Sequence, residues 1–177
     1  MDEEDKQARF EAAMMPHLDA AYNLARWLTR NEHDAQDVAQ DAYLRAFRFF
    51  EGFRGGNSRS WLLSIVRNTA YTWLQKNRKH ELVTLPEEEL RNIEDPAADA
   101  AAALFRGAEH ELVRQTLEEL PVEFREVMIL RELEELSYKE IAEISGVPIG
   151  TVMSRLARAR KLLQNRLAER LQPGEQR

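Results

Sequence analysis

The sequence predicts an all-α protein built from two small helical domains that are joined by a flexible linker. Three observations predict it: the few glycines are grouped in turns, no run of alternating β-branched residues suggests a strand, and apolar residues recur at helical spacing in two separate blocks. Between the blocks lies a stretch rich in alanine and acidic residues. We place the first domain at residues 5–80, the linker at 81–108 and the second domain at 109–172.

Three helices are predicted in the first block. The first has one apolar face, formed by Leu18, Ala21, Tyr22, Ala25 and Leu28. Asn31 is predicted to cap the second helix, because its side chain can accept a hydrogen bond from an amide of the first turn. A glycine-rich loop at 52–58 ends that helix, and the third helix begins near Ser60.

Basic residues are concentrated in two stretches, although the whole chain has a formal net charge of −6. Residues 54–80 contain six arginine and lysine residues and no acidic residue, and residues 151–171 contain six basic residues opposed by Glu169. Phosphates respond to the local rather than the net charge. The two stretches are therefore compatible with two nucleic-acid contact surfaces, or with two solvated helix faces.

The second block contains a helix-turn-helix pattern at residues 137–161. A capping box begins its first helix at Ser137, and Gly146 supplies the left-handed conformation that ends it. Pro148 is predicted to begin the second helix, where Val152 points inward and the basic side chains point outward. Such a unit lays its second helix in the major groove of DNA. We therefore predict DNA binding in preference to a purely structural pair of helices.

Composition excludes several kinds of site. The chain has no cysteine, so it holds no disulfide, thiolate zinc site or cysteine nucleophile. Its four histidines are far apart, and it has no phosphate-binding glycine loop. No stretch approaches the roughly 20 apolar residues of a membrane span, and the acidic N-terminus is unlike a secretory signal. We expect a cytoplasmic protein with no membrane insertion, no metal and no cofactor.

Three segments of the chain resemble the extracytoplasmic-function (ECF, group 4) sigma factors of the sigma-70 family. Residues 120–161, with the core Leu-Arg-Glu-Leu-Glu-Glu-Leu-Ser-Tyr-Lys-Glu-Ile-Ala, resemble sigma region 4. Residues 34–47 and 60–70 resemble sigma region 2, and their order along the chain is that of the family. The resemblance implies an alternative sigma factor, which directs RNA polymerase to specific promoters and is not an enzyme.

The resemblance implies that the region 4 domain reads the −35 promoter element through its helix-turn-helix. The matching residues would face bases or phosphates: Thr151, Met153, Ser154, Arg155, Ala157, Arg158, Arg160 and Lys161. Many members of the family have Lys or Arg where this chain has Met153. The base preference at that position is therefore open.

The region 2 domain is implied to recognise and melt the −10 element, with a loop that captures unpaired bases and a helix that faces the DNA. The matching residues are Phe53, Arg54, Asn57, Ser58, Arg59, Ser60, Trp61, Arg67, Asn68, Thr72, Lys76 and Arg78. Trp61 lies at helical spacing from Ile65, so for this residue a place in the core is favoured over a stacking surface.

The resemblance also implies contacts with core RNA polymerase, at the clamp coiled coil of the β′ subunit and at the β flap. An acidic stripe matches the surface that grips the coiled coil, and it consists of Asp34, Asp37, Gln40, Asp41 and Leu44. A further expected partner is an anti-sigma factor that lies between the two domains and buries both DNA faces. Through such a partner the chain can be held at the inner membrane.

Two alternative functions stay open on the residues alone. A stand-alone helix-turn-helix regulator explains the second domain, but it leaves the acid-free basic stretch of the first domain without a purpose. An enzyme with Asp34, Asp37 and Asp41 as metal ligands in a helical bundle would normally add a Glu-x-x-His motif, which the sequence lacks.

Overall fold

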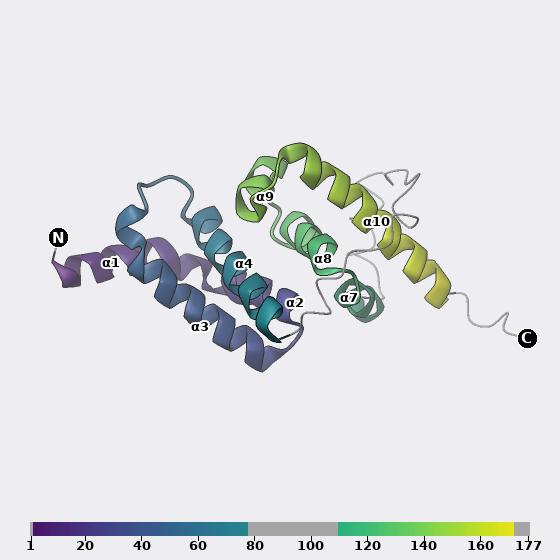
Figure 1. Cartoon of the computed structure of the whole chain (residues 1–177), viewed down its shortest axis with the longest axis horizontal. Helices are drawn as coiled ribbons and strands as arrows, with labels where there is room; N and C mark the ends of the chain where they lie inside the picture. Colours follow the sequence, from purple (N-terminus) through teal and green to yellow (C-terminus); the bar gives the residue numbers. More distant parts are fainter. Residues whose placement is uncertain (1, 78–109, 172–177) are drawn as a thin grey trace, which may run out of the picture. The chain divides into compact units, whose positions relative to one another are not determined.

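The computed structural model describes residues 2–77 and 110–171, and within these ranges the regular structure is helical throughout (Figure 1). The prediction of an all-α fold with two small units is confirmed, since the chain divides into two compact units. The exact domain limits remain a prediction. The linker predicted at 81–108 lies outside the described residues.

Four α-helices and two short 3₁₀ turns follow one another between residues 2 and 77. They are α1 (Glu3–Met14), η1 (Met15–His17), α2 (Leu18–Thr29), α3 (Glu32–Arg48), η2 (Phe50–Gly52) and α4 (Ser58–Asn77). Helices α2, α3 and α4 pack against one another and form a three-helix core. Each contributes fully buried aliphatic side chains, among them Leu24, Ala42 and Leu62.

The cap predicted for α3 is confirmed, because the backbone N–H of Asp34 donates to the side-chain oxygen of Asn31 over 3.0 Å. The apolar face predicted for α2 differs at two residues, because Tyr22 is half-buried and Leu18 is exposed. Leu18 is 40% exposed, since it is the first residue of the helix, while Leu24 and Leu28 are fully buried. The core therefore begins one turn later than the periodicity predicted.

Residues 110–171 contain four α-helices and one π turn. They are α7 (His110–Glu118), α8 (Val122–Met128), the π turn η4 (Ile129–Leu133), α9 (Tyr138–Ser145) and α10 (Ile149–Leu171). Helix α10 packs against α7 and α8. Near its C-terminal end, Arg166 donates to the carbonyl oxygen of Glu119 over 3.0 Å, and Arg170 donates to the hydroxyl of Thr116 over 2.9 Å.

The helix-turn-helix has the predicted capping geometry. The backbone N–H of Glu140 donates to the Ser137 hydroxyl over 3.1 Å, and the Glu140 carboxylate accepts from the N–H of Ser137 over 3.2 Å. Gly146 has φ +68°, and its N–H bonds to the carbonyl of Ala142. Helix α10 begins at Ile149, one residue later than predicted. The preceding Pro148 accepts hydrogen bonds from the first turn with its carbonyl oxygen.

Candidate nucleic-acid interface

The outer face of α10 has an apolar flank and a basic flank. With a rotation of roughly 100° per residue, Met153 and Ala157 lie on one side, and Thr151, Arg155 and Arg158 lie on the other. Met153 is 52% exposed, and the three polar side chains of the opposite flank are half-buried. Between the flanks, and pointing most directly outward, lie Ser154 and Lys161.

Arg160 does not belong to this outer face, which corrects the prediction that it lies close to phosphates. Its side chain is 2% exposed, and its guanidinium lies 3.7 Å from the carboxylate of Glu132. The reason is helix phase, because Arg160 follows the buried Val152 and Leu156 at spacings of eight and four. A buried arginine without a counter-charge is costly, so the pair with Glu132 belongs to the fold.

The loop between η2 and α4 is the predicted base-capturing loop. Gly55 and Gly56 have φ values of +86° and +89°, a region that side chains other than glycine rarely adopt. At the end of the loop the side chain of Asn57 accepts the N–H of Ser60 over 3.1 Å and so caps α4. The side chain of Asn57 is thereby hydrogen-bonded to the backbone of α4, and Ser60 is only 4% exposed. Of the predicted loop residues, Arg54 is well exposed and Phe53 is half-buried.

Aromatic rings pack against Phe53, the first residue of this loop. The ring centroids of Phe53 and Trp61 are 5.1 Å apart, and those of Phe50 and Phe53 are 5.9 Å apart in a stacked arrangement. Trp61 is half-buried and also meets Phe50 edge-on at 6.5 Å. Trp61 thus packs mainly into the protein, and one part of its surface stays accessible.

The residues predicted to face DNA on α4 divide into two faces. Asn68, Thr72 and Lys76 repeat at a spacing of four along one face. Arg67 lies roughly 100° away around the helix. Its guanidinium is 3.8 Å from the ring centroid of Tyr71, a stacked cation–π contact. Arg78, the last residue of the predicted set, lies outside the described residues.

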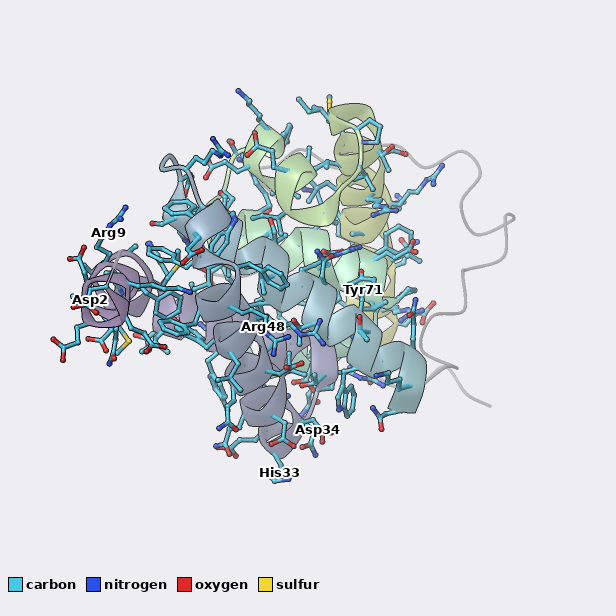
Figure 2. The ribbon with its side chains drawn as sticks, turned by 60° about the vertical axis from the view of Figure 1, so that its left-hand side comes forward. Asp2, Arg9, His33, Asp34, Arg48 and Tyr71 are labelled. Atoms are coloured by element: carbon cyan, nitrogen blue, oxygen red, sulfur yellow. The ribbon has the colours of Figure 1, made fainter. Side chains whose placement is uncertain are left out.

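The acidic stripe lies on the exposed side of α3. Asp37, Gln40 and Asp41 are exposed, and Leu44 beside them is 64% exposed. Asp34 is half-buried and lies in the first turn, at the end of α3 where His33 and Asp34 are labelled in Figure 2.

Two basic side chains of the same helix flank the stripe. The imidazole of His33 is 3.7 Å from the carboxylate of Asp37, and the guanidinium of Arg45 is 3.2 Å from that of Asp41. Both pairs are exposed and therefore contribute little to stability. Such weak pairs leave the carboxylates available to a partner.

A groove of about 270 Å³ joins this stripe to the side of α4 that is predicted to face DNA. Asp37, Asp41 and Arg45 line it from α3, and Thr72 and Lys76 line it from α4. Trp73 of α4 forms part of the same wall. One groove is therefore bordered by both of the predicted interaction surfaces.

Two family models match the chain, Sigma-70 region 2 over residues 14–80 and Sigma-70 region 4 over residues 110–163. The ECF RNA polymerase sigma-E factor of Haemophilus influenzae is 35% identical over 155 residues, which cover 81% of this chain and 79% of that protein. The chain belongs to the ECF sigma factors. The RNA polymerase sigma-H factor of Pseudomonas aeruginosa is 33% identical and covers 92% of this chain and 88% of its own length.

Other relatives of this ECF sigma factor support the same assignment. The ECF RNA polymerase sigma factor SigE of Mycolicibacterium smegmatis is 36% identical over 86% of this chain, which spans only 59% of that longer protein. Among solved structures, the sigma factor RpoE of Bartonella quintana, in complex with the anti-sigma factor NepR, has a TM-score of 0.69. It is 27% identical, and the match covers 90% of this chain and 97% of that one.

Three residues near these surfaces escaped prediction. Phe10 and His17 contact the segments on either side of the region 2 loop, and Tyr71 stacks on Arg67. For Phe10 a signal was present, since Phe10 and Met14 lie one helical turn apart and both are buried. No local pattern marks His17, because its partner Ser58 is 41 residues away in the chain.

Two further results concern the described residues alone. Within residues 2–77 and 110–171 no helix has the length and apolar character needed to cross a membrane. In the same ranges no group of three His, Asp or Glu residues has an arrangement suited to a metal ion, and the three aspartates of α3 form no such group.

The lowered pKa of His17 predicts that the stability of the fold depends on pH. Burial, and to a lesser extent the nearby Arg59, lowers the pKa of His17 from its ordinary value of 6.5. As the pH falls below that value, the unfolded chain takes up a proton before the folded chain does. The contribution of His17 is thus complete at neutral pH and is lost as the pH falls through the ordinary value toward the lowered one.

Thermal unfolding between about pH 7.5 and about pH 5.5 measures this effect. The melting temperature of the wild-type chain should fall over this range by more than that of His17→Gln, whose side chain does not titrate. Equal slopes for the two proteins would show that His17 keeps its ordinary pKa.

Proposed function

We propose that this chain is an alternative sigma factor that binds core RNA polymerase in the bacterial cytoplasm, directs it to specific promoters and catalyses no reaction itself. The observation that supports this most directly is the pairing of two matches, a region 4 helix-turn-helix and a region 2 unit, in one chain. A stand-alone regulator has no use for region 2. We propose domain limits of 5–80 and 109–172, slightly wider than the two matched ranges.

In vitro transcription tests the proposed function. Core polymerase without a sigma factor is combined with the purified chain and a genomic DNA library, and the transcript starts are sequenced. We expect discrete starts that share two upstream sequence elements. Starts no different from those of core polymerase alone would refute the proposal.

We infer that the outer face of α10 reads the −35 element. Ser154, Arg155, Arg158 and Lys161 provide hydroxyl, guanidinium and ammonium groups that suit base edges and phosphates. Met153 adds an exposed apolar contact, for which the methyl group of thymine is the matching feature of the major groove. Specificity on this flank would thus differ from that of members with a cation at this position.

The salt dependence of binding tests the role of Arg158. Arg158→Ala should weaken binding to a −35 duplex and reduce the slope of log affinity against log salt by about 1, since one phosphate contact releases one counterion. Arg166→Ala is the matched control. It removes the same charge from the same helix, but Arg166 is bonded to the carbonyl of Glu119. A slope that both variants change equally, or neither changes, contradicts the assignment.

We infer that region 2 captures the melted −10 strand. The loop at 53–60, with Arg54 and Arg59, provides a basic surface beside the ring of Trp61. Asn68, Thr72 and Lys76 continue along α4. Unpaired bases are stabilised by stacking and by a basic groove that follows the backbone. Because Asn57 and Ser60 are engaged within the fold, they would act through the shape of the loop.

We infer that the acidic stripe of α3 binds the β′ clamp coiled coil, while region 4 contacts the β flap. The exposed Leu44 beside Asp37, Gln40 and Asp41 forms a small apolar centre with a charged rim, as protein interfaces commonly have. The exposed intrahelical contacts of Asp37 with His33 and of Asp41 with Arg45 are exchangeable for stronger intermolecular ones.

Reversal of one charge tests the polymerase contact. Asp37→Arg should lower the affinity for core polymerase by at least about tenfold. The introduced arginine would repel the positive charges that the acidic stripe is proposed to bind. Glu32→Arg makes the same charge reversal at an exposed position of α3 that lies roughly 140° from Asp37 around the helix, and it should leave the affinity nearly unchanged. Normal complex formation by Asp37→Arg on gel filtration would remove the stripe from the interface.

We infer that an anti-sigma factor controls this chain by covering both DNA faces, and that such a partner can hold it at the inner membrane. The support is the Bartonella quintana structure, in which a sigma factor of similar fold is bound to the anti-sigma factor NepR. Affinity purification of the tagged chain from unstressed cells should recover a second stoichiometric protein. Recovery of polymerase alone from cells in which the factor is always active would contradict control by an anti-sigma factor.

A further inference from the structure

Helix α1 lies mostly before the region 2 match, which begins at residue 14. It packs onto the bundle through Phe10, which is 7% exposed, while Asp2 and Arg9 are seen on its outer side in Figure 2. The ring of Phe10 meets those of Tyr43, Phe47 and Phe50 edge-on, with centroid distances of 6.2, 5.3 and 5.4 Å. Phe10 is thus the centre of an aromatic cluster that includes the end of α3.

The cluster continues into the base-capturing loop. Phe50, which Phe10 contacts, stacks on Phe53 at 5.9 Å, and Phe53 packs on Trp61 at 5.1 Å. Phe53 is the residue that precedes the exposed Arg54 and the two glycines with positive φ. A continuous row of rings therefore connects α1 with the first residue of the loop.

The same N-terminal segment also contacts the other end of the loop. In η1, the Nε2 atom of His17 lies 3.0 Å from the hydroxyl of Ser58, the first residue of α4. The Tyr43 hydroxyl donates to the carbonyl of Met14 over 3.1 Å, which fixes the junction between α1 and η1. Residues 54–57 are thus held between two anchors that both originate in residues 10–17.

Lys6 adds a third contact on the side of η2. Its ammonium group is 3.9 Å from the carboxylate of Glu51 and 4.8 Å from the ring centroid of Phe47. Lys6 is the half-buried member of this pair, and its contact with the ring is favourable in its own right.

We propose that Phe10 and His17 are positioning residues for the capture of unpaired promoter bases. Gly55 and Gly56 give the loop a large conformational entropy, which binding must otherwise overcome. The ring cluster and the His17–Ser58 hydrogen bond hold the two ends of the loop at a constant separation before DNA arrives. Neither residue contacts DNA in this proposal, which rests on the proposed function of region 2.

The test uses full-length variants. Phe10→Leu keeps an apolar side chain but removes the ring contacts, and His17→Leu removes the hydrogen bond, which His17→Gln can restore. The probe is a labelled single-stranded oligonucleotide with the non-template −10 sequence of a promoter mapped by the transcription experiment. Phe10→Leu should weaken its binding to the polymerase complex about fivefold, as expected for the loss of aromatic pairs. His17→Leu should weaken it less, and His17→Gln should bind as the wild type does.

Leu28→Val is the control for general destabilisation, because Leu28 is fully buried in the same unit, near the C-terminal end of α2. This variant should bind the probe normally. Affinity for core polymerase and for a −35 duplex should be unchanged in all variants. Normal probe binding by Phe10→Leu, or equal losses in Phe10→Leu and Leu28→Val, would overturn the proposal.

Hydrogen exchange of the free chain separates this inference from the proposed function. The amides of residues 53–57 should exchange at least about threefold faster in Phe10→Leu than in Leu28→Val, whereas α2 and α3 exchange alike. Unchanged exchange at 53–57 overturns the positioning role, even if the wild-type chain directs transcription. A wild-type chain that fails to direct transcription refutes the proposed function alone, since loop exchange is measured without DNA.

Discussion

The region 2 surface depends on one constraint: a loop built around two glycines must be held in shape by groups outside itself. Two adjacent glycines with left-handed backbone angles give the loop no rigidity of their own. The capped start of α4, the ring of Trp61 and the contacts of α1 and η1 provide that rigidity. Residues 10–17, which are far from this loop in the sequence, thus converge on it together with residues 50–53 and 57–61.

The charges of this ECF sigma factor are divided between fold and function, and burial decides to which each belongs. Arg125 is 2% exposed and donates to the carbonyls of Glu118 and Leu120, so it holds the turn before α8. Arg160 pairs with Glu132 inside the second unit. The basic character of α10 is therefore smaller on its outer face than a count along the sequence suggests, and its binding surface combines few cations with polar and apolar side chains.

Local chemistry made much of this fold predictable. The cap at Asn31, the capping box at Ser137 and the turn at Gly146 depend on neighbours within four residues, so the sequence contains all the information needed. Arg160 was wrongly assigned to the outer face of α10. The prediction considered the charges along the sequence and not the rotation of successive residues around the helix. The contacts of Phe10 and His17 were not predictable, because they join residues about 40 positions apart whose meeting is decided by the packing of whole helices.

The groove between α3 and α4 has a consequence for genetics. Lys76 and Thr72 share its walls with Asp37 and Asp41, so a substitution there alters two surfaces together. With the roles proposed for the two surfaces, a strain that carries a change at Lys76 loses transcription through poor promoter opening, through poor assembly of the holoenzyme, or through both. Suppressor mutations of such an allele would accordingly arise in two places, in promoter sequences and in the gene for the β′ subunit.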